Sequence, residues 1–367
     1  MRVEDELLLL AVNAQLAAHR TRAAQLLQAA DSARLVAELR RLRVLPVLGE
    51  RLARHVELPR HLRAAIDEAR RTNALHGMLA EAHTRELHRA LEAEGIRMLA
   101  LKGQSLAVEA HGAPDMRDST DIDVLVPVER LWDATAVLER KGYRVSTRGP
   151  ELPSLHVVAA HRTEARPAIE LHWRIHWYEE SFSRRLLDTS TAGRDGFLHP
   201  DPATMFTSLL SYYARDGFAG LRLLADVVGF AERHPAVRSP GVIADEARRH
   251  PSLLPAIEAA ARSVRRLTGL TIPGVGEELS RRQRLAVRLA DPLQRSPLDQ
   301  RVAVTHLVDG LLSPRGGGRE YLLGRLTMFD TRAGNTLHLA RTGVRWSIAL
   351  ATVASPARRG TRVASGQ

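Results

Sequence analysis

The chain has 367 residues, of which 44% are hydrophobic and 4% aromatic, and it carries no cysteine and a formal net charge of +11 at pH 7. This length predicts two or three packed domains, and the lack of cysteine excludes disulfide bonds, cysteine-ligated zinc and thiol nucleophiles. The positive charge would allow binding of nucleic acid, but acidic residues are interspersed with the arginines, so charge alone does not imply it.

The apolar pattern does not indicate export or membrane insertion. The first apolar run, 7–12, follows acidic residues rather than the basic segment of a signal peptide. A later apolar run near 347–353 is far shorter than the roughly 18 residues that a membrane span needs. We therefore expect a cytoplasmic protein with no membrane partner.

Residues 1–95 are expected to form a helical region. Ser32 is a candidate cap for a helix that runs to Arg43, because leucine and valine residues recur on one face of that segment. A long amphipathic helix is predicted over 60–94. Pro59 precedes it and Gly95 follows it, as expected for the two ends of a helix.

Short strands alternate with short helices between 96 and 178, which we predict to be a separate core. Strands are expected at 97–101, 121–126, 143–145, 156–161 and 168–175, and helices at 104–110 and 129–141. The last two strands are expected to pair as a hairpin. This mixed order predicts an α+β fold with a small mixed sheet rather than a doubly wound one.

The rest of the chain is expected to be mainly helical. Helices at 202–214 and 221–234 belong to a helical region, 179–235, that we expect to pack beside the core. Several further helices are predicted within 236–354, and 355–367 is expected to be a disordered basic tail.

The most informative segment is 98–126, in which a strand leads into a helix and a second strand begins with two acids. Asp121 and Asp123 are two residues apart on that strand, so their carboxylates point to the same face. Two such carboxylates favour a cation between them, and oxygen ligands suit Mg²⁺ together with substrate phosphates. The helix that begins at Gly103 offers free N–H groups to those phosphates.

This pattern resembles the DNA polymerase β-type nucleotidyltransferases and, more closely, the bacterial group called nucleotidyltransferase family 5. The resemblance covers roughly 35–230, and the matching residues are Leu101-Lys102-Gly103, Arg117, Asp121-Ile122-Asp123-Val124-Leu125-Val126 and Glu170-Leu171-His172-Trp173. The group would supply a polymerase β-like core flanked by N- and C-terminal helical regions. It would use Mg²⁺ or Mn²⁺ with a nucleoside triphosphate as co-substrate.

Glu170 lies on a strand expected beside the aspartate strand, and the resemblance makes it the third metal carboxylate and a base for the attacking hydroxyl. An alternative for Glu170 is a surface ion pair with Arg174. His172 shares its strand face. The H-x3-H spacing of His172 and His176 would suit zinc on a helix, but this segment is predicted as a strand, so no zinc site is expected there.

Six residues are candidates for binding the nucleotide: Lys102, Gly103, Ser105, Arg117, Arg222 and Asp226. Family members usually carry Gly-Ser or Gly-Gly at the start of the helix, whereas this chain has Gly103-Gln104-Ser105. Lys102 or Arg117 is therefore expected to share the terminal phosphates. The alternative for Arg222 and Asp226, four apart on a helix, is an ordinary surface ion pair.

The resulting hypothesis is a nucleotidyltransferase that moves a nucleoside monophosphate to an acceptor hydroxyl and releases pyrophosphate. The acceptor would be a small molecule, a peptide, a protein or RNA. Two alternatives remain: a phosphotransferase that uses the same metal and triphosphate, and a catalytically inactive scaffold that binds nucleic acid or a protein.

Overall fold

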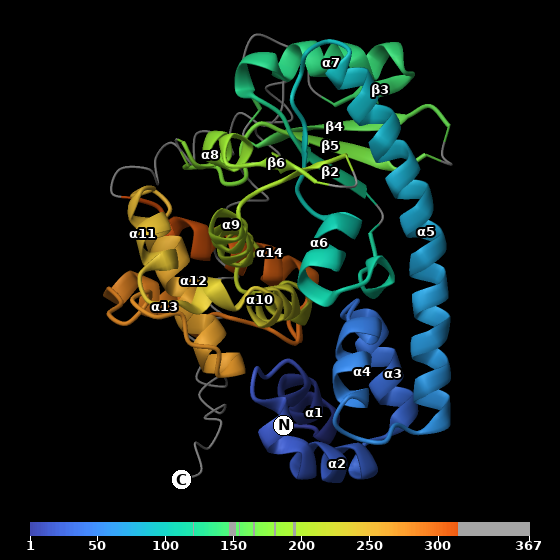
Figure 1. Cartoon of the computed structure of the whole chain (residues 1–367). Coiled ribbons are helices and arrows are strands. Elements are labelled where there is room, and N and C mark those ends of the chain that lie inside the picture. Colours follow the sequence, from blue (N-terminus) through green and yellow to red (C-terminus); the bar gives the residue numbers. More distant parts are fainter. Residues whose placement is uncertain are drawn as a thin grey trace.

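The computed structural model describes residues 1–119, 121–146, 152–153, 155–163, 166–179, 181–193 and 196–314. Figure 1 shows a sheet in the upper part of the molecule, with α7 on one side of it and α6, α9 and α10 on the other. The N-terminal helices lie below α6, and the last helices lie beside α9 and α10. The predicted α+β class and mixed sheet are confirmed.

The N-terminal region is helical, as predicted. It comprises α1 (Val3–Ala11), η1 (Leu16–His19), α2 (Arg20–Ala29), α3 (Ser32–Arg41), α4 (Leu45–Ala53) and α5 (Arg60–Glu92). The predicted cap at Ser32 is wrong by one residue, because the Asp31 side chain accepts the hydrogen bond from Arg34 N. Helix α5 follows Pro59 and runs from the N-terminal bundle up to the sheet (Figure 1).

Within the described residues the main sheet has five strands, in the order β1-β2-β5-β4-β3. They are β1 (Leu99–Ala100), β2 (Asp121–Leu125), β3 (Tyr143–Val145), β4 (His156–His161) and β5 (Ala168–His172). Strands β2 and β5 are parallel, whereas the other neighbours are antiparallel. The predicted hairpin of β4 and β5 is therefore confirmed. Strand β5 ends earlier than predicted, because Glu179, rather than a neighbouring strand, accepts from Ile175 N at 2.7 Å.

The helices between and after the strands are α6 (Gly103–His111), η2 (Pro114–Met116), η3 (Val128–Arg130), α7 (Leu131–Arg140), α8 (Phe182–Asp188), α9 (Pro202–Arg215), α10 (Leu221–Arg233), η4 (Pro235–Arg238), α11 (Val242–Arg248), α12 (Leu254–Thr268), α13 (Arg281–Arg288) and α14 (Leu298–Leu312). A second sheet pairs β6 (Thr191–Ala192) with β7 (Leu198–His199). The expected tail, 355–367, and the part of the expected helical region after 314 lie outside the described residues.

The two faces of the main sheet differ in chemistry because side chains alternate along each strand. Ile122, Val124, Ile169 and Leu171 belong to an apolar cluster that also includes Leu131 and Leu138 of α7 and Leu87 and Leu91 of α5. The residues between them, such as Asp123 and Glu170, lie on the opposite face. This face is turned toward α6 and α9 (Figure 1), and it carries the candidate site.

A larger apolar core joins the two helical regions. It includes Leu8 of α1, Leu48 of α4, Leu209 of α9 and Ile257 of α12, all with no exposed surface. Among the described residues, no helix is both long enough and apolar enough to cross a membrane.

Candidate active site

The predicted carboxylates come together because β2 and β5 are parallel neighbours in register. Asp123 lies opposite Glu170, and Asp121 lies opposite Ala168. Asp121 and Asp123 are two residues apart on β2, and Glu170 lies directly opposite Asp123 on β5, so the three side chains share one face of the sheet. The structure thus places the three predicted acids on one side of two adjacent strands.

Asp123 is the most constrained of these acids. Its side chain is 5% exposed, and Oδ1 accepts from Lys102 Nζ at 3.0 Å and lies 3.2 Å from His172 Nε2. Burial acts to raise the pKa of Asp123, but the hydrogen bond from His172 and the charge of Lys102 outweigh it and hold that pKa well below the usual range. Asp123 is therefore a carboxylate at neutral pH.

Glu170 is more open, with 30% of its side chain exposed. Its Oε2 lies 3.3 Å from His172 Nε2 and 3.9 Å from His156 Nε2. The hydrogen bond with His172 lowers the pKa of Glu170 despite its partial burial. The Arg174 guanidinium lies over the Trp173 ring, 4.4 Å from its centre.

Helix α6 begins beside these acids. Gly103 is its first residue and has a φ of +74°, a conformation that glycine adopts without the steric cost of a Cβ. Among the described residues no side chain caps this helix, so its first N–H groups remain available for an anion. A Cβ built on Gly103 would lie 3.6 Å from Ser119 Oγ, which places Ser119 at the same turn.

Lys102 connects this turn to the acids and to α9. Besides its bond to Asp123, its Nζ lies 4.9 Å from the centre of the Tyr212 ring. The Arg215 guanidinium lies on the same ring, at 4.8 Å. Two cations and the acids thus meet where α9 covers the sheet, an arrangement suited to an anionic ligand that also requires a cation.

The residues predicted at Arg117 and Asp226 form a separate buried cluster. Arg117 Nε lies 3.1 Å from Asp226 Oδ2, and His111 Nε2 lies 2.9 Å from Asp226 Oδ1. Both side chains of the Arg117–Asp226 pair are at most 4% exposed. This pair joins the segment before β2 to α10. Asp226 is therefore a buried residue, and the surface ion pair that we considered for Arg222 and Asp226 is not found among the described residues.

Arg222 extends this cluster toward the α6 turn. Its Nη2 donates to the carbonyl oxygen of Asp118, and its Nε is buried without a hydrogen-bond partner in the described part of the chain. Burial and, after it, the nearby charge of Arg117 lower the pKa of Arg222 to about 10. Two neighbouring arginines near the turn favour the approach of an anion.

Reasoning from sequence did not identify His156, Ser119, Tyr212 or Arg215 as site residues. His156 lies directly opposite His172 on β4, and the predicted hairpin could have indicated it had the strand register been known. Tyr212 and Arg215 give no such signal, because the packing of α9 on the sheet depends on long-range contacts. His176, by contrast, is buried beside Trp177 and Tyr178 rather than with His172.

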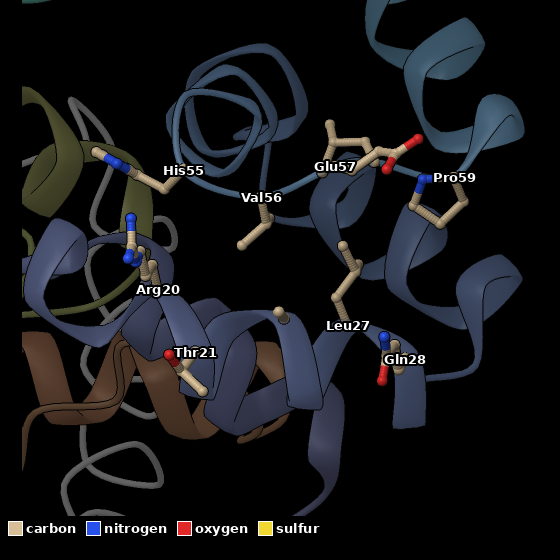
Figure 2. A pocket seen from close by; sticks show the side chains of 10 residues that line it. Arg20, Thr21, Leu27, Gln28, His55, Val56, Glu57 and Pro59 are labelled. Atoms are coloured by element: carbon tan, nitrogen blue, oxygen red, sulfur yellow. The ribbon is translucent and has the colours of Figure 1, made fainter.

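Two pockets lie away from the acids. One of about 670 Å³ lies between α2 and the segment that joins α4 to α5, where Arg20, Gln28 and His55 line it (Figure 2). Another, of about 240 Å³, lies between α4, α6 and α10, beside His111. Neither pocket is lined by Asp121, Asp123 or Glu170, so the candidate site is identified by its chemistry rather than by a pocket.

The donor set fits a divalent cation. Asp123 and Glu170 are ionised, lie on the same face of the sheet and share His172 as a neighbour. The ammonium group of Lys102 already lies beside the Asp123 carboxylate. Carboxylate oxygens with a nearby phosphate site suit Mg²⁺ or Mn²⁺.

A sequence profile of the family described as uncharacterised nucleotidyltransferase matches residues 28–268. The chain belongs to this nucleotidyltransferase family. The match includes the acids, the α6 turn and helix α10, and it confirms the resemblance seen in the sequence. No curated protein and no solved structure matches the chain.

Proposed function

We propose that this nucleotidyltransferase family member transfers a nucleoside monophosphate from a nucleoside triphosphate to an acceptor hydroxyl, with release of pyrophosphate. The observation that carries this proposal is the register of β2 and β5, which sets Asp123 opposite Glu170 beside the uncapped start of α6. Acids alone would suit many metal sites, and a helix start alone would suit many anions. Together they favour a metal-bound triphosphate.

Each residue has a distinct task in this proposal. Asp121, Asp123 and Glu170 hold Mg²⁺ or Mn²⁺, which when bound neutralises charge on the triphosphate and its leaving group. The N–H groups from Gly103 to Ser105 bind phosphate oxygens. Lys102 exchanges its bond with Asp123 for one with phosphate, since a flexible ammonium group can reach either partner.

The remaining groups orient these residues or act on the acceptor. Glu170 is partly exposed, so one of its oxygens can accept the proton of the acceptor hydroxyl. His172 contacts both Asp123 and Glu170 and holds their carboxylates in place. Arg222 adds a positive charge near the phosphates. Arg117 and Asp226 hold the segment before β2, so their contribution to nucleotide binding is indirect.

The test uses purified protein with Mg²⁺ or Mn²⁺ and each of the four nucleoside triphosphates labelled at the α-phosphate. A cell extract separated into RNA, protein and small molecules supplies the acceptor. We expect label in one fraction with wild type and none with Asp121→Asn or Asp123→Asn. Asp133→Asn is the matched control, because Asp133 is a 63% exposed acid of α7, on the other face of the sheet.

The label position distinguishes the alternatives. Transfer from γ-labelled but not α-labelled nucleotide would make the protein a phosphotransferase. No transfer of either label, with salt-dependent binding of nucleic acid that Asp123→Asn leaves unchanged, would contradict transfer and support a binding scaffold.

A further inference from the structure

Two histidines stand beside Glu170, and neither is among the carboxylate metal ligands proposed above. His156 and His172 lie directly opposite each other on β4 and β5, and their ring centres are 4.6 Å apart. Glu170 lies two residues before His172 on the same face. Three side chains with metal-binding atoms therefore converge on one spot of the sheet.

Their geometry fits a single ion. The ligand atoms of His156, Glu170 and His172 all lie within 4.8 Å of one another, and the two Nε2 atoms lie 3.9 Å and 3.3 Å from Glu170 Oε2. Ligands bound to one ion at about 2.0–2.2 Å stand roughly 3.0–3.6 Å apart. Because no two of these atoms are more than 4.8 Å apart, side-chain movements of about an ångström would bring all three within this range.

The orientation of the rings agrees with this arrangement. The Nδ1 atoms of His156 and His172 are buried without a hydrogen-bond partner among the described residues, and the Nε2 atoms are the ones that face Glu170. His172 Nε2 also lies 3.2 Å from Asp123 Oδ1, but Asp123 is not one of the three residues whose ligand atoms converge. Two imidazole nitrogens with carboxylate oxygens form a mixed donor set.

We propose that His156, Glu170 and His172 form a binding site for a transition-metal ion of the zinc, cobalt or manganese class. Imidazole ligands suit such ions, whereas Mg²⁺ prefers oxygen ligands. The site needs neither nucleotide nor acceptor, so it goes beyond the proposed transfer reaction. Because Glu170 is common to both, an ion held here also fixes the third carboxylate against β4.

Binding of Co²⁺ to metal-free, untagged full-length protein tests this inference through the visible absorption of the bound ion. The chain has no cysteine, so thiolate bands cannot obscure the spectrum. We expect one equivalent of Co²⁺ to bind without nucleotide, to be displaced by Zn²⁺, and to resist a hundredfold excess of Mg²⁺.

The variants are chosen so that folding and transfer can be separated from metal binding. His156→Ala removes a half-buried side chain and is expected to weaken Co²⁺ binding at least tenfold, with an unchanged circular dichroism spectrum. His161→Ala is the matched control, because His161 is at the other end of β4 and its Nε2 lies 3.2 Å from the Lys141 carbonyl oxygen. It should bind Co²⁺ as wild type does.

Asp121→Asn distinguishes the two proposals. It should retain Co²⁺ binding within threefold while it loses transfer of the α-labelled phosphate. Co²⁺ binding by wild type without any transfer would contradict only the proposed function. Absence of Co²⁺ binding, equal binding by His156→Ala and wild type, or displacement by equimolar Mg²⁺ would overturn the metal site.

Discussion

Lys102 links the carboxylates of the candidate site to the start of helix α6. Its ammonium group is bonded to Asp123 and lies over the Tyr212 ring, while its backbone stands at the start of α6. A cation with 19% of its side chain exposed remains accessible to a substrate phosphate. The chain has one other lysine, Lys141, so a matched comparison is available.

We expect Lys102→Met to lower kcat/KM for nucleotidyl transfer 10- to 100-fold, equivalent to about 1.4–2.8 kcal/mol of transition-state stabilisation. Lys102→Arg should recover part of the loss, because it restores the charge but not the compact shape. Steady-state kinetics with α-labelled nucleotide measure both effects.

Lys141→Met provides the control, since Lys141 Nζ pairs with Glu86 at 3.1 Å, away from the acids. Its kcat/KM should remain within twofold of wild type. Equal kinetics for Lys102→Met and wild type would show that Lys102 does not act on the phosphates.

At the scale of elements, the candidate site depends on how α6 and α10 hold the segment that enters β2. Gly229 of α10 packs against the end of α6, where an added Cβ would lie 2.5 Å from the carbonyl oxygen of Ala110. A backbone atom cannot move aside easily. This glycine therefore sets the distance between the two helices.

Gly229→Ala should destabilise the protein by about 2 kcal/mol or more, because the added methyl group overpacks a helix contact. Urea unfolding followed by circular dichroism measures this. Gly77→Ala of α5 is the contrasting variant: its Cβ would meet the flexible Gln104 side chain, and alanine favours a helix by up to about 1 kcal/mol. Similar destabilisation by both substitutions would refute the explanation.

The Arg117–Asp226 pair between α10 and the segment before β2 predicts a dependence of stability on pH. Burial acts to raise the pKa of Asp226, but Arg117 and then His111 lower it to about 2. A lowered carboxyl pKa stabilises the folded protein above the unfolded value of 3.8, and this stabilisation is lost as the pH falls toward 2. The shift corresponds to about 2 kcal/mol.

We therefore expect wild type to exceed Asp226→Asn in unfolding free energy by about 3–5 kcal/mol at pH 5, since the variant leaves Arg117 buried without its partner. The difference should shrink by about 1 kcal/mol between pH 5 and pH 3. Urea titrations at the two pH values measure this difference. A difference in unfolding free energy that grew on acidification would contradict the lowered pKa of Asp226 in the folded protein.

For the whole molecule, the large apolar core crosses the region boundaries that the sequence suggested. It includes Leu8 near the start of the chain, Leu125 of the sheet and Ile257 of α12. A core shared in this way predicts that the terminal helical regions and the sheet unfold together rather than as separate domains.

Ile257→Ala tests this cooperativity, because Ile257 is fully buried in α12. We expect the free energy of unfolding to fall by about 2–4 kcal/mol. Hydrogen-exchange mass spectrometry in urea should show the same loss of protection in α12 and in β2 and β5. Val108→Ala, at a 41% exposed position of α6, should change neither the free energy of unfolding nor the exchange of these elements. Faster exchange in α12 with unchanged protection of the sheet would instead indicate independent domains.

The sequence by itself determined the local features of this protein. The helix after Pro59, the turn at Gly103 and the strand with Asp121 and Asp123 follow from short-range rules of periodicity and capping, and the motifs indicated the family. Such features depend on neighbours a few residues away. The sequence was also sufficient to predict the hairpin of β4 and β5.

Only the tertiary structure decided which distant side chains meet. It placed His156 beside Glu170, brought Lys102 and Arg215 onto the Tyr212 ring of α9, and paired Arg117 with Asp226 rather than leaving both open to a nucleotide. These contacts depend on strand register and helix packing, which the whole core fixes. Local preference cannot set them, because a shift of one residue in register would turn each side chain to the other face.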